Sequence, residues 1–430
     1  MKIRIRNGRL VDPASGTDAV RDVFIAAGRI AAIGAPPDAF HANRVIDAAG
    51  LVVCPGLIDL SARLREPGYE YRATLESEME AAVAGGVTTL ACPPDTDPPL
   101  DEPGLVEMLK YRARNLNRAR VCPLGALTTG LSGKRLTEMA ELTEAGCVGF
   151  SQAGTPVVDT AVLRSAMQYA AGFGYAVWLQ PEDSFLAGKG VAHDGEVASR
   201  LGLAGIPVVA ETIALFTLLQ LARETGVRLH VMRLSSAAGV AMLRAAREGG
   251  LAVSADVSIN HLHLSEADIG YFDPHARLGP PLRAASDREA LRAAAADGTI
   301  DAICSDHTPV DDDAKQLPFG EAEPGATGLE LLLPLTLKWG EELGLPLARS
   351  LARITTEPAR ILGLEAGRME PGAAADLCLF DPLAERTVSR AGLVSQGKNT
   401  PFLGAHLKAV VRMTLVGGNP VYEAGRSDQG

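Results

Sequence analysis

The residues best suited to chemistry stand where apolar runs of the sequence end. An apolar run at 51–60 leads to Ser61 and Arg63, which are two residues apart and so face the same side of an extended chain. A second, mostly apolar run at 300–305 ends at Asp306, whose carboxylate could move a proton or bind a metal ion. Arginines beside a single aspartate suit an anion better than a metal cation.

Strand and helix patterns alternate through the middle of the chain and would position these residues. Eight strands are expected at 52–60, 87–92, 120–126, 147–151, 175–180, 227–234, 251–257 and 300–306, with helical patterns between most of them. This order predicts an α/β fold built on a (β/α)8 TIM barrel, whose active-site residues lie at the carboxyl ends of the strands. A doubly wound open sheet is the competing architecture, but eight strands between two β-rich chain ends favour the barrel.

The two ends of the chain read as short strands joined by tight turns, such as Asn7-Gly8 and Ala27-Gly28. Neither end has enough apolar residues for a core of its own. We therefore expect residues 1–51 and 366–430 to form one composite β-sandwich domain, and residues 52–365 to form the barrel domain.

Composition excludes several classes of protein. The 430 residues carry a formal net charge of −11 with no run of Lys or Arg, which argues against nucleic-acid binding. There is no apolar run long enough to span a membrane and no signal peptide at the N-terminus, so a cytoplasmic protein is expected. The six cysteines form no CxxC pair and are expected to be buried thiols.

Motifs along nearly the whole chain resemble those of the dihydroorotase family, within the amidohydrolase superfamily. The stretch Pro55-Gly-Leu-Ile-Asp59, continued by Leu64-Arg-Glu-Pro-Gly68, is similar to the family's PGLIDxHxHLREPG. Similar motifs follow in the family's order: Gly85-Gly-Val-Thr-Thr89, Gly202-Leu-Ala-Gly-Ile-Pro207, Gly279-Pro-Pro-Leu-Arg283, Ser305-Asp-His-Thr-Pro309 and Asn399-Thr-Pro-Phe-Leu-Gly404. The resemblance implies a barrel of the amidohydrolase type.

The same resemblance implies a centre of two zinc ions, which activate the hydroxide that attacks a cyclic amide. The family's ligand positions are occupied here by Ser61, Arg63, Gln152, Gln180, Arg233 and Asp306, and only the last keeps the family's residue type. Glutamine and un-ionised serine are poor zinc ligands, and arginine repels a cation. We therefore expect no zinc and no catalytic residue, with Asp306 vestigial and paired with Arg63 or Arg233 in place of the metal.

The resemblance also points to remnants of a substrate pocket. Arg65 stands at the family's position for binding a substrate carboxylate. Asp95 and Gly279 each replace a family asparagine, and Val310 replaces a histidine. An acidic Asp95 would repel an anionic substrate, so recognition is expected to be weakened together with metal binding.

Other polar residues are interpreted as structural. His307 follows Asp306 on the opposite side of the strand, and His261 and His263, although spaced like a metal pair, lie where the family has no ligands. His230 is expected to be a packed strand residue. The acidic pair Glu182-Asp183 is expected to cap or orient the following segment and not to act as acid and base.

Three functions follow as hypotheses. The leading one, implied by resemblance to silent members of the family, is a non-catalytic dihydroorotase-like subunit of pyrimidine biosynthesis that supports assembly or activity of aspartate transcarbamoylase. It would form a hetero-oligomer with the catalytic chain of that enzyme, or a homodimer. The first alternative is an active cyclic-amide hydrolase with an atypical or absent metal centre, using Asp306 as base. The second is an anion-sensing module built on Arg63, Arg65 and Arg233.

Overall fold

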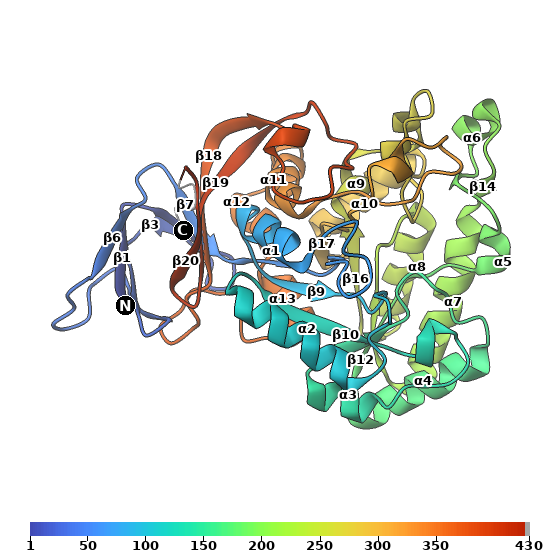
Figure 1. Cartoon of the computed structure of the whole chain (residues 1–430), viewed down its shortest axis with the longest axis horizontal. Helices are drawn as coiled ribbons and strands as arrows, with labels where there is room; N and C mark the ends of the chain where they lie inside the picture. The colour runs from blue at the N-terminus through green and yellow to red at the C-terminus, as the bar shows by residue number, and fades with distance from the viewer. Residues whose placement is uncertain (426–430) are drawn as a thin grey trace.

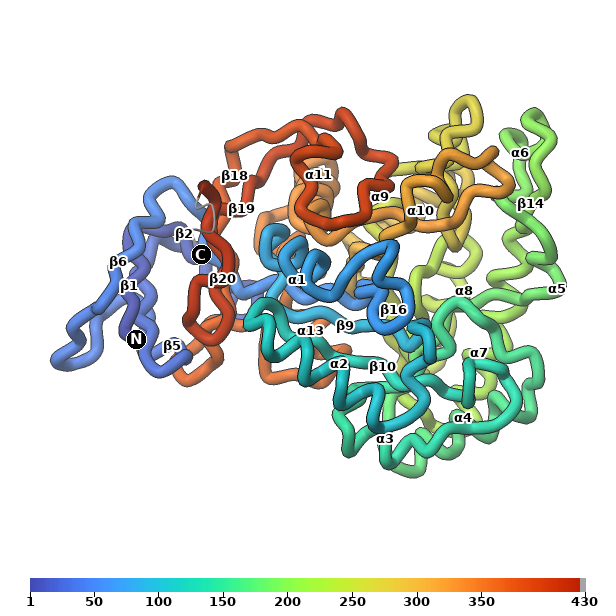
Figure 2. The backbone as a smooth tube through the Cα atoms, viewed as in Figure 1, coloured from blue at the N-terminus to red at the C-terminus, as the bar shows by residue number. Residues whose placement is uncertain are grey.

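The structure, a computed structural model that describes residues 1–425, joins a β-sandwich to a strand-and-helix barrel (Figure 1). The N-terminal strands and the last strands of the chain lie together at one end of the molecule, as the backbone tube also shows (Figure 2). Segments from the two chain termini thus meet in one unit, as the sequence predicts.

The sandwich consists of two sheets. Its strands are β1 (Lys2–Arg6), β2 (Arg9–Asp12), β3 (Thr17–Val20), β4 (Val23–Ala26), β5 (Arg29–Ile33), β6 (Arg44–Asp47), β7 (Val52–Pro55), β18 (Leu377–Thr387), β19 (His406–Val416) and β20 (Asn419–Glu423). One sheet has the order β5-β4-β1-β6 and the other β20-β19-β18-β7-β2-β3. Buried Ile3 and Ile25 of the first sheet share a core with Leu377 and Leu415 of the second, because alternate residues of each strand face inward.

The barrel sheet contains eight parallel strands in the order β17-β16-β15-β12-β11-β10-β9-β8. Their bounds are β8 (Leu57–Asp59), β9 (Val87–Cys92), β10 (Arg120–Ala126), β11 (Gly149–Ser151), β12 (Ala176–Leu179), β15 (Arg228–Val231), β16 (Val253–Ser258) and β17 (Ala302–Cys304). A bridge between Ala62 and His307 joins the first and last strands, with the amide of His307 donating to the carbonyl of Ser61 over 3.0 Å. The predicted TIM barrel is therefore present.

Helices surround the barrel sheet. They are α1 (Leu75–Ala84), α2 (Pro103–Leu116), α3 (Met139–Ala145), α4 (Thr160–Phe173), α5 (Ser184–Ala187), α6 (Glu196–Leu201), α7 (Val208–Thr225), α8 (Ala237–Glu248), α9 (Ile259–His263), α10 (Ala285–Asp297), α11 (Leu332–Glu342), α12 (Leu347–Ala352) and α13 (Thr356–Leu362). A two-stranded ribbon, β13 (Ala192–His193) and β14 (Gly205–Ile206), lies between α5 and α7 in the chain. No helix within residues 1–425 is long and apolar enough to cross a membrane, and all six cysteines are buried free thiols.

The strand predicted at 52–60 is wrong as a single strand. Gly56 divides it, and its amide donates to the carbonyl of Asp376 over 2.8 Å. Before this residue β7 pairs with β2 and β18 of the sandwich, and after it β8 pairs with β9 of the barrel. A Cβ atom at Gly56 would come within 2.2 Å of the Thr88 hydroxyl oxygen, so the chain can change sheets here only with a glycine.

Candidate functional site

The six predicted ligand positions all follow barrel strands. Ser61 follows β8, Gln152 follows β11, Gln180 follows β12, Arg233 follows β15 and Asp306 follows β17, while Arg63 lies two residues beyond Ser61. The carboxyl ends of parallel barrel strands meet at one rim, so the fold brings these positions to the same end of the barrel. Of the six, Gln180 alone is not fully buried.

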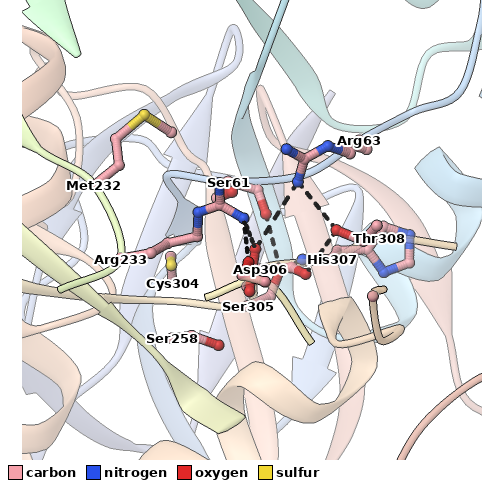
Figure 3. Close-up of polar contacts among 12 residues, drawn as sticks. Ser61, Arg63, Met232, Arg233, Ser258, Cys304, Ser305, Asp306, His307 and Thr308 are labelled. Atoms are coloured by element: carbon pink, nitrogen blue, oxygen red, sulfur yellow. Dashed lines mark hydrogen bonds and ion pairs between the residues drawn. The ribbon is translucent and has the colours of Figure 1, made fainter. Parts of the chain in front are cut away.

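An ion pair occupies the centre of this rim. Nη1 of Arg233 lies 2.9 Å from Oδ1 of Asp306, and Nη1 of Arg63 lies 3.9 Å from the same oxygen (Figure 3). The side chains of Arg233 and Asp306 are 4% and 5% exposed. The predicted pairing of Asp306 with an arginine is confirmed.

Arg233 has further partners that hold it in place. Its Nη1 donates to the carbonyl of Gly279 over 3.0 Å, and its Nη2 donates to the side-chain oxygen of Gln180. Arg233 and Asp306 both adopt left-handed backbone conformations, with φ of 51° and 52°. Non-glycine residues rarely adopt this conformation unless the surrounding structure holds them there.

The other two positions do not reach this pair. Gln152 donates from Nε2 to the hydroxyl of Thr128 over 2.8 Å. The hydroxyl of Ser61 is buried and makes no hydrogen bond within the described part of the chain. The structure therefore brings together Arg63, Gln180, Arg233 and Asp306, but not Ser61 and Gln152.

These residues do not fit a centre of two zinc ions. Within residues 1–425, no three His, Cys, Asp or Glu side chains are grouped so that they could hold a metal ion. The one remaining carboxylate, Asp306, already accepts a hydrogen bond from the Arg233 guanidinium. A cation at this place would meet two arginines that keep their charge at any ordinary pH.

The histidines are engaged in structural contacts. The ring of His230 contacts Asp256 through Nε2 at 2.9 Å and Ser254 through Nδ1 at 2.8 Å. Nε2 of His307 lies 2.6 Å from Glu78, and both side chains are fully buried. The remaining predicted pair, His261 and His263, contacts the backbone carbonyls of Pro281 and Leu335. Burial lowers the pKa of His261 and of His263 to about 4, so both rings are neutral near pH 7.

A cavity of about 380 Å³ opens above the ion pair and contains the predicted pocket remnants Arg65, Asp95 and Gly279. Nε of Arg65 donates to the carbonyl of Pro309 over 2.9 Å, and burial, followed by the charge of Arg63, lowers the pKa of Arg65 to about 10. Val310 is buried and does not line the cavity. Burial opposes ionisation of Asp95, but Arg63, whose Nε lies 2.6 Å away, outweighs it and the pKa of Asp95 is lowered.

Three charged cavity residues escaped prediction. Arg72 and Glu323 form an ion pair of 2.8 Å at the mouth, and Arg277 lines the opening near Gly279. Arg277 was detectable, since it stands two residues before the Gly279 motif. The pairing of Arg72 with Glu323 spans 251 positions and gives no local signal. Asp183 accepts from the amides of Phe185 and Leu186 at the start of α5, so its predicted capping role is confirmed.

Comparison with known proteins agrees with this fold. The sequence model of a family described as dihydro-orotase-like matches residues 50–238, and that of the amidohydrolase family matches residues 191–422. A dihydroorotase-like protein of Pseudomonas aeruginosa is 46% identical over 423 residues, which are 98% of this chain and all of that protein. The chain belongs to the dihydroorotase-like family of the amidohydrolase superfamily.

Relatives of this dihydroorotase-like chain carry more than one description. A protein of Geobacter sp. (strain M21) that is 40% identical, over 99% of this chain and 100% of its own length, is named dihydroorotase. Among solved structures, the L-hydantoinase (dihydropyrimidinase) of Arthrobacter aurescens superposes with a TM-score of 0.88 at 27% identity, covering 99% of this chain and 96% of its own. The fold is therefore that of amidohydrolase enzymes.

Proposed function

We propose that this chain is a non-catalytic dihydroorotase-like subunit of pyrimidine biosynthesis, which supports the assembly or activity of aspartate transcarbamoylase. The observation that carries the proposal is the position of the Arg233 guanidinium, 2.9 Å from Asp306 at the centre of the barrel rim. The Arg233 guanidinium, an internal cation, contacts the carboxylate that family members use in their chemistry.

The pair explains how the fold keeps a buried carboxylate without a metal ion. An isolated ionised carboxylate costs several kcal/mol to bury, roughly, and a partner of opposite charge offsets that cost. The Gly279 carbonyl and Gln180 accept hydrogen bonds from Nη1 and Nη2 of Arg233, while its buried Nε makes none within the described residues. The arrangement stabilises the rim, and it does not require an activated water molecule.

The first alternative, hydrolysis of a cyclic amide without the usual centre, would use Asp306 as base and Arg63 or Arg65 to stabilise negative charge. Oδ1 of Asp306 already accepts a hydrogen bond from Arg233 over 2.9 Å and lies 3.9 Å from Nη1 of Arg63. A general base must reach the proton that it removes, and a guanidinium occupies that place on this oxygen. The pair therefore favours the non-catalytic role.

The partner is proposed from resemblance to silent family members, in a cytoplasmic hetero-oligomer. The barrel scaffold and sandwich are intact while the rim has changed, which is the pattern expected when a surface, and not a reaction, has been retained. No zinc is expected in the purified protein.

The test is elemental analysis of the purified full-length chain, followed by a dihydroorotase assay of the same sample with and without added zinc. An active homologue prepared in parallel is the positive control. Less than a stoichiometric amount of zinc and no turnover support the proposal, whereas bound zinc with zinc-dependent turnover refutes it. Co-expression with the aspartate transcarbamoylase chain of the same organism should then give a complex that co-elutes and has higher transcarbamoylase activity than that chain alone.

We also propose, as a second candidate, that the cavity above the ion pair senses an anion. Arg65 and Arg277 line it, and within the described chain no carboxylate lies at ion-pair distance from either. The midpoint temperature of thermal unfolding should then rise when inorganic phosphate or succinate is added, and Arg65→Met should remove this rise. An equal rise for the unmodified protein and the Arg65→Met variant would refute this role.

A further inference from the structure

A second cavity, of about 780 Å³, lies between the barrel and the sandwich and has about twice the volume of the cavity at the rim. One wall is the C-terminal half of α2 with the start of β10, and the other is the turn between β19 and β20. Figure 1 shows α2 running along the barrel with one end toward the sandwich. Because Arg120 is the first residue of β10, this cavity lies at the amino end of the barrel sheet, opposite the rim that carries Arg233 and Asp306.

The wall formed by α2 and β10 is cationic. Lys110 and Arg114 are four residues apart and therefore lie on the same side of α2, and Arg118 and Arg120 follow directly after the helix. None of the described residues that line the cavity is acidic, although the whole chain has a net charge of −11. Like charges four residues apart destabilise a helix, so a bound anion would relieve a repulsion that is built into α2.

Arg118 and Arg120 already have carboxylate partners outside the cavity. Nε and Nη2 of Arg120 donate to the two carboxylate oxygens of Asp376 over 3.0 and 3.1 Å, and Nη2 of Arg118 donates to Glu80 over 3.3 Å. The amide of Gly417, in the opposite wall, donates to Asp376 over 2.6 Å. These contacts fix the sandwich turn against the start of β10, so the cavity is formed before any ligand binds, which lowers the cost of binding.

Lys110 and Arg114 are the cations that remain for a ligand. Nζ of Lys110 donates to the carbonyl of Ala145 over 3.3 Å, and the side chain of Arg114 is exposed. Within residues 1–425 no carboxylate lies at ion-pair distance from either. Attraction to the carbonyl end of α2 accounts for Arg114, which is in the last turn, but this attraction does not extend to Lys110. Two cations of this kind suit the oxygens of a phosphate group, to which they donate charge-assisted hydrogen bonds.

The rest of the lining is largely apolar and includes Ala113, Val121, Val416, Pro420 and Val421. A phosphate ion would fill little of this volume, since one water molecule takes about 30 Å³. Sites for organic ligands occupy about 300–1,000 Å³, combine apolar walls with a few charged groups, and often lie between domains. The ligand that fits therefore has a multiply charged group at one end and an apolar ring at the other.

We propose that this cavity binds a nucleotide, with Lys110 and Arg114 on its phosphate groups and the apolar wall of the sandwich turn against its base. Arg118 and Arg120 keep the potential of the cavity positive without having to leave their partners. The site is separate from the rim, and the inference does not depend on the proposed partnership with aspartate transcarbamoylase.

The test is isothermal titration calorimetry of the full-length chain with ADP, pyrophosphate and adenosine. ADP should bind at one site, more tightly than pyrophosphate, and adenosine should not bind detectably because it has no charged group. Lys110→Gln and Arg114→Gln should each raise the Kd for ADP about 10-fold or more, as expected for the loss of a charge-assisted hydrogen bond. Arg200→Gln is the matched control and should leave the Kd unchanged, since Arg200 is also exposed in the last turn of a helix and has no carboxylate partner within the described residues.

The place of binding is checked by hydrogen–deuterium exchange. ADP should slow exchange in residues 110–122 and 416–421, the two walls of the cavity. Arg65→Met, which changes the rim cavity, should bind ADP as the unmodified chain does. Far-UV circular dichroism and thermal unfolding identify any variant that fails to fold, and Arg114→Gln, at an exposed position, decides the test if Lys110→Gln does not fold.

Four results would overturn the proposal. The first is the absence of ADP binding to the unmodified chain at millimolar concentration. The second is an affinity for ADP that neither substitution on α2 changes. The third is an affinity for ADP no higher than that for pyrophosphate, which would exclude a contact with the base. The fourth is loss of ADP binding in Arg65→Met, which would place the ligand at the rim.

Discussion

Replacing Arg233 by methionine should destabilise the fold substantially. The substitution leaves the Asp306 carboxylate, which is 5% exposed, without its cation at 2.9 Å. Breaking a buried ion pair from one side typically costs about 3–5 kcal/mol. Arg63, at 3.9 Å from the same oxygen, remains and compensates in part, so we expect the lower end of that range, about 3 kcal/mol.

The assay is urea-induced unfolding followed by far-UV circular dichroism, with the free energy of unfolding obtained by linear extrapolation. The double variant Arg233→Met with Asp306→Leu removes both charges and should regain much of the loss, because an apolar pair of similar volume replaces a buried ion pair at little cost. Arg164→Met, at an exposed pair with Glu224, is the control and should leave the midpoint unchanged. A loss at Arg233 no larger than in the control, or a double variant as unstable as the single one, would refute the role given to the pair.

Three further outcomes are expected. Arg65→Met should cost less than half as much stability as Arg233→Met in the same urea assay. The Arg65 guanidinium is buried, and no carboxylate within residues 1–425 lies at ion-pair distance from it, so its removal relieves a desolvation penalty. An equal loss would contradict this. Burial lowers the pKa of Lys315 from its ordinary 10.5 to about 7, so between these pH values the unfolded chain holds the extra proton, and stability relative to Lys315→Met should rise with pH from 7 toward 9. A flat difference between the two proteins over that range would count against it. Elemental analysis should find zinc in a variant that restores the family's ligand types, but not in the unmodified chain. The variant carries Ser61→His, Arg63→His, Gln152→Asp, Gln180→His and Arg233→His. Zinc in both proteins, or in neither, would contradict the argument from ligand types.

The sequence predicted the barrel well because its strands are short apolar runs separated by amphipathic helices. All eight expected strands overlap a strand of the barrel sheet. The pairing of Asp306 with an arginine, either Arg63 or Arg233, was also predictable, since a buried carboxylate beside two arginines has few other partners; that Arg233 is the nearer one was not. That prediction depended on residue type and strand order, both of which are read directly from the chain.

Other features depend on contacts between distant residues. Nothing in the buried run at 52–60 distinguishes a sandwich strand from a barrel strand, because both need apolar residues. The division at Gly56 is set by pairing with residues 377–380, far along the chain. Likewise, the burial of His307 against Glu78 joins positions 229 residues apart, which no local pattern reveals.

The place where the chain changes sheets has a consequence for the order of folding. In the six-stranded sheet Pro55 lies opposite Leu377, so the chain enters the barrel and leaves it through adjacent strands. The whole barrel is in effect a loop inserted between β7 and β18, and such distant pairing is slow until the intervening chain is compact. Amides of β7 and β18 should therefore become protected in pulse-labelling hydrogen exchange after those of the barrel strands, which would make completion of the sandwich a late signal that the barrel has closed.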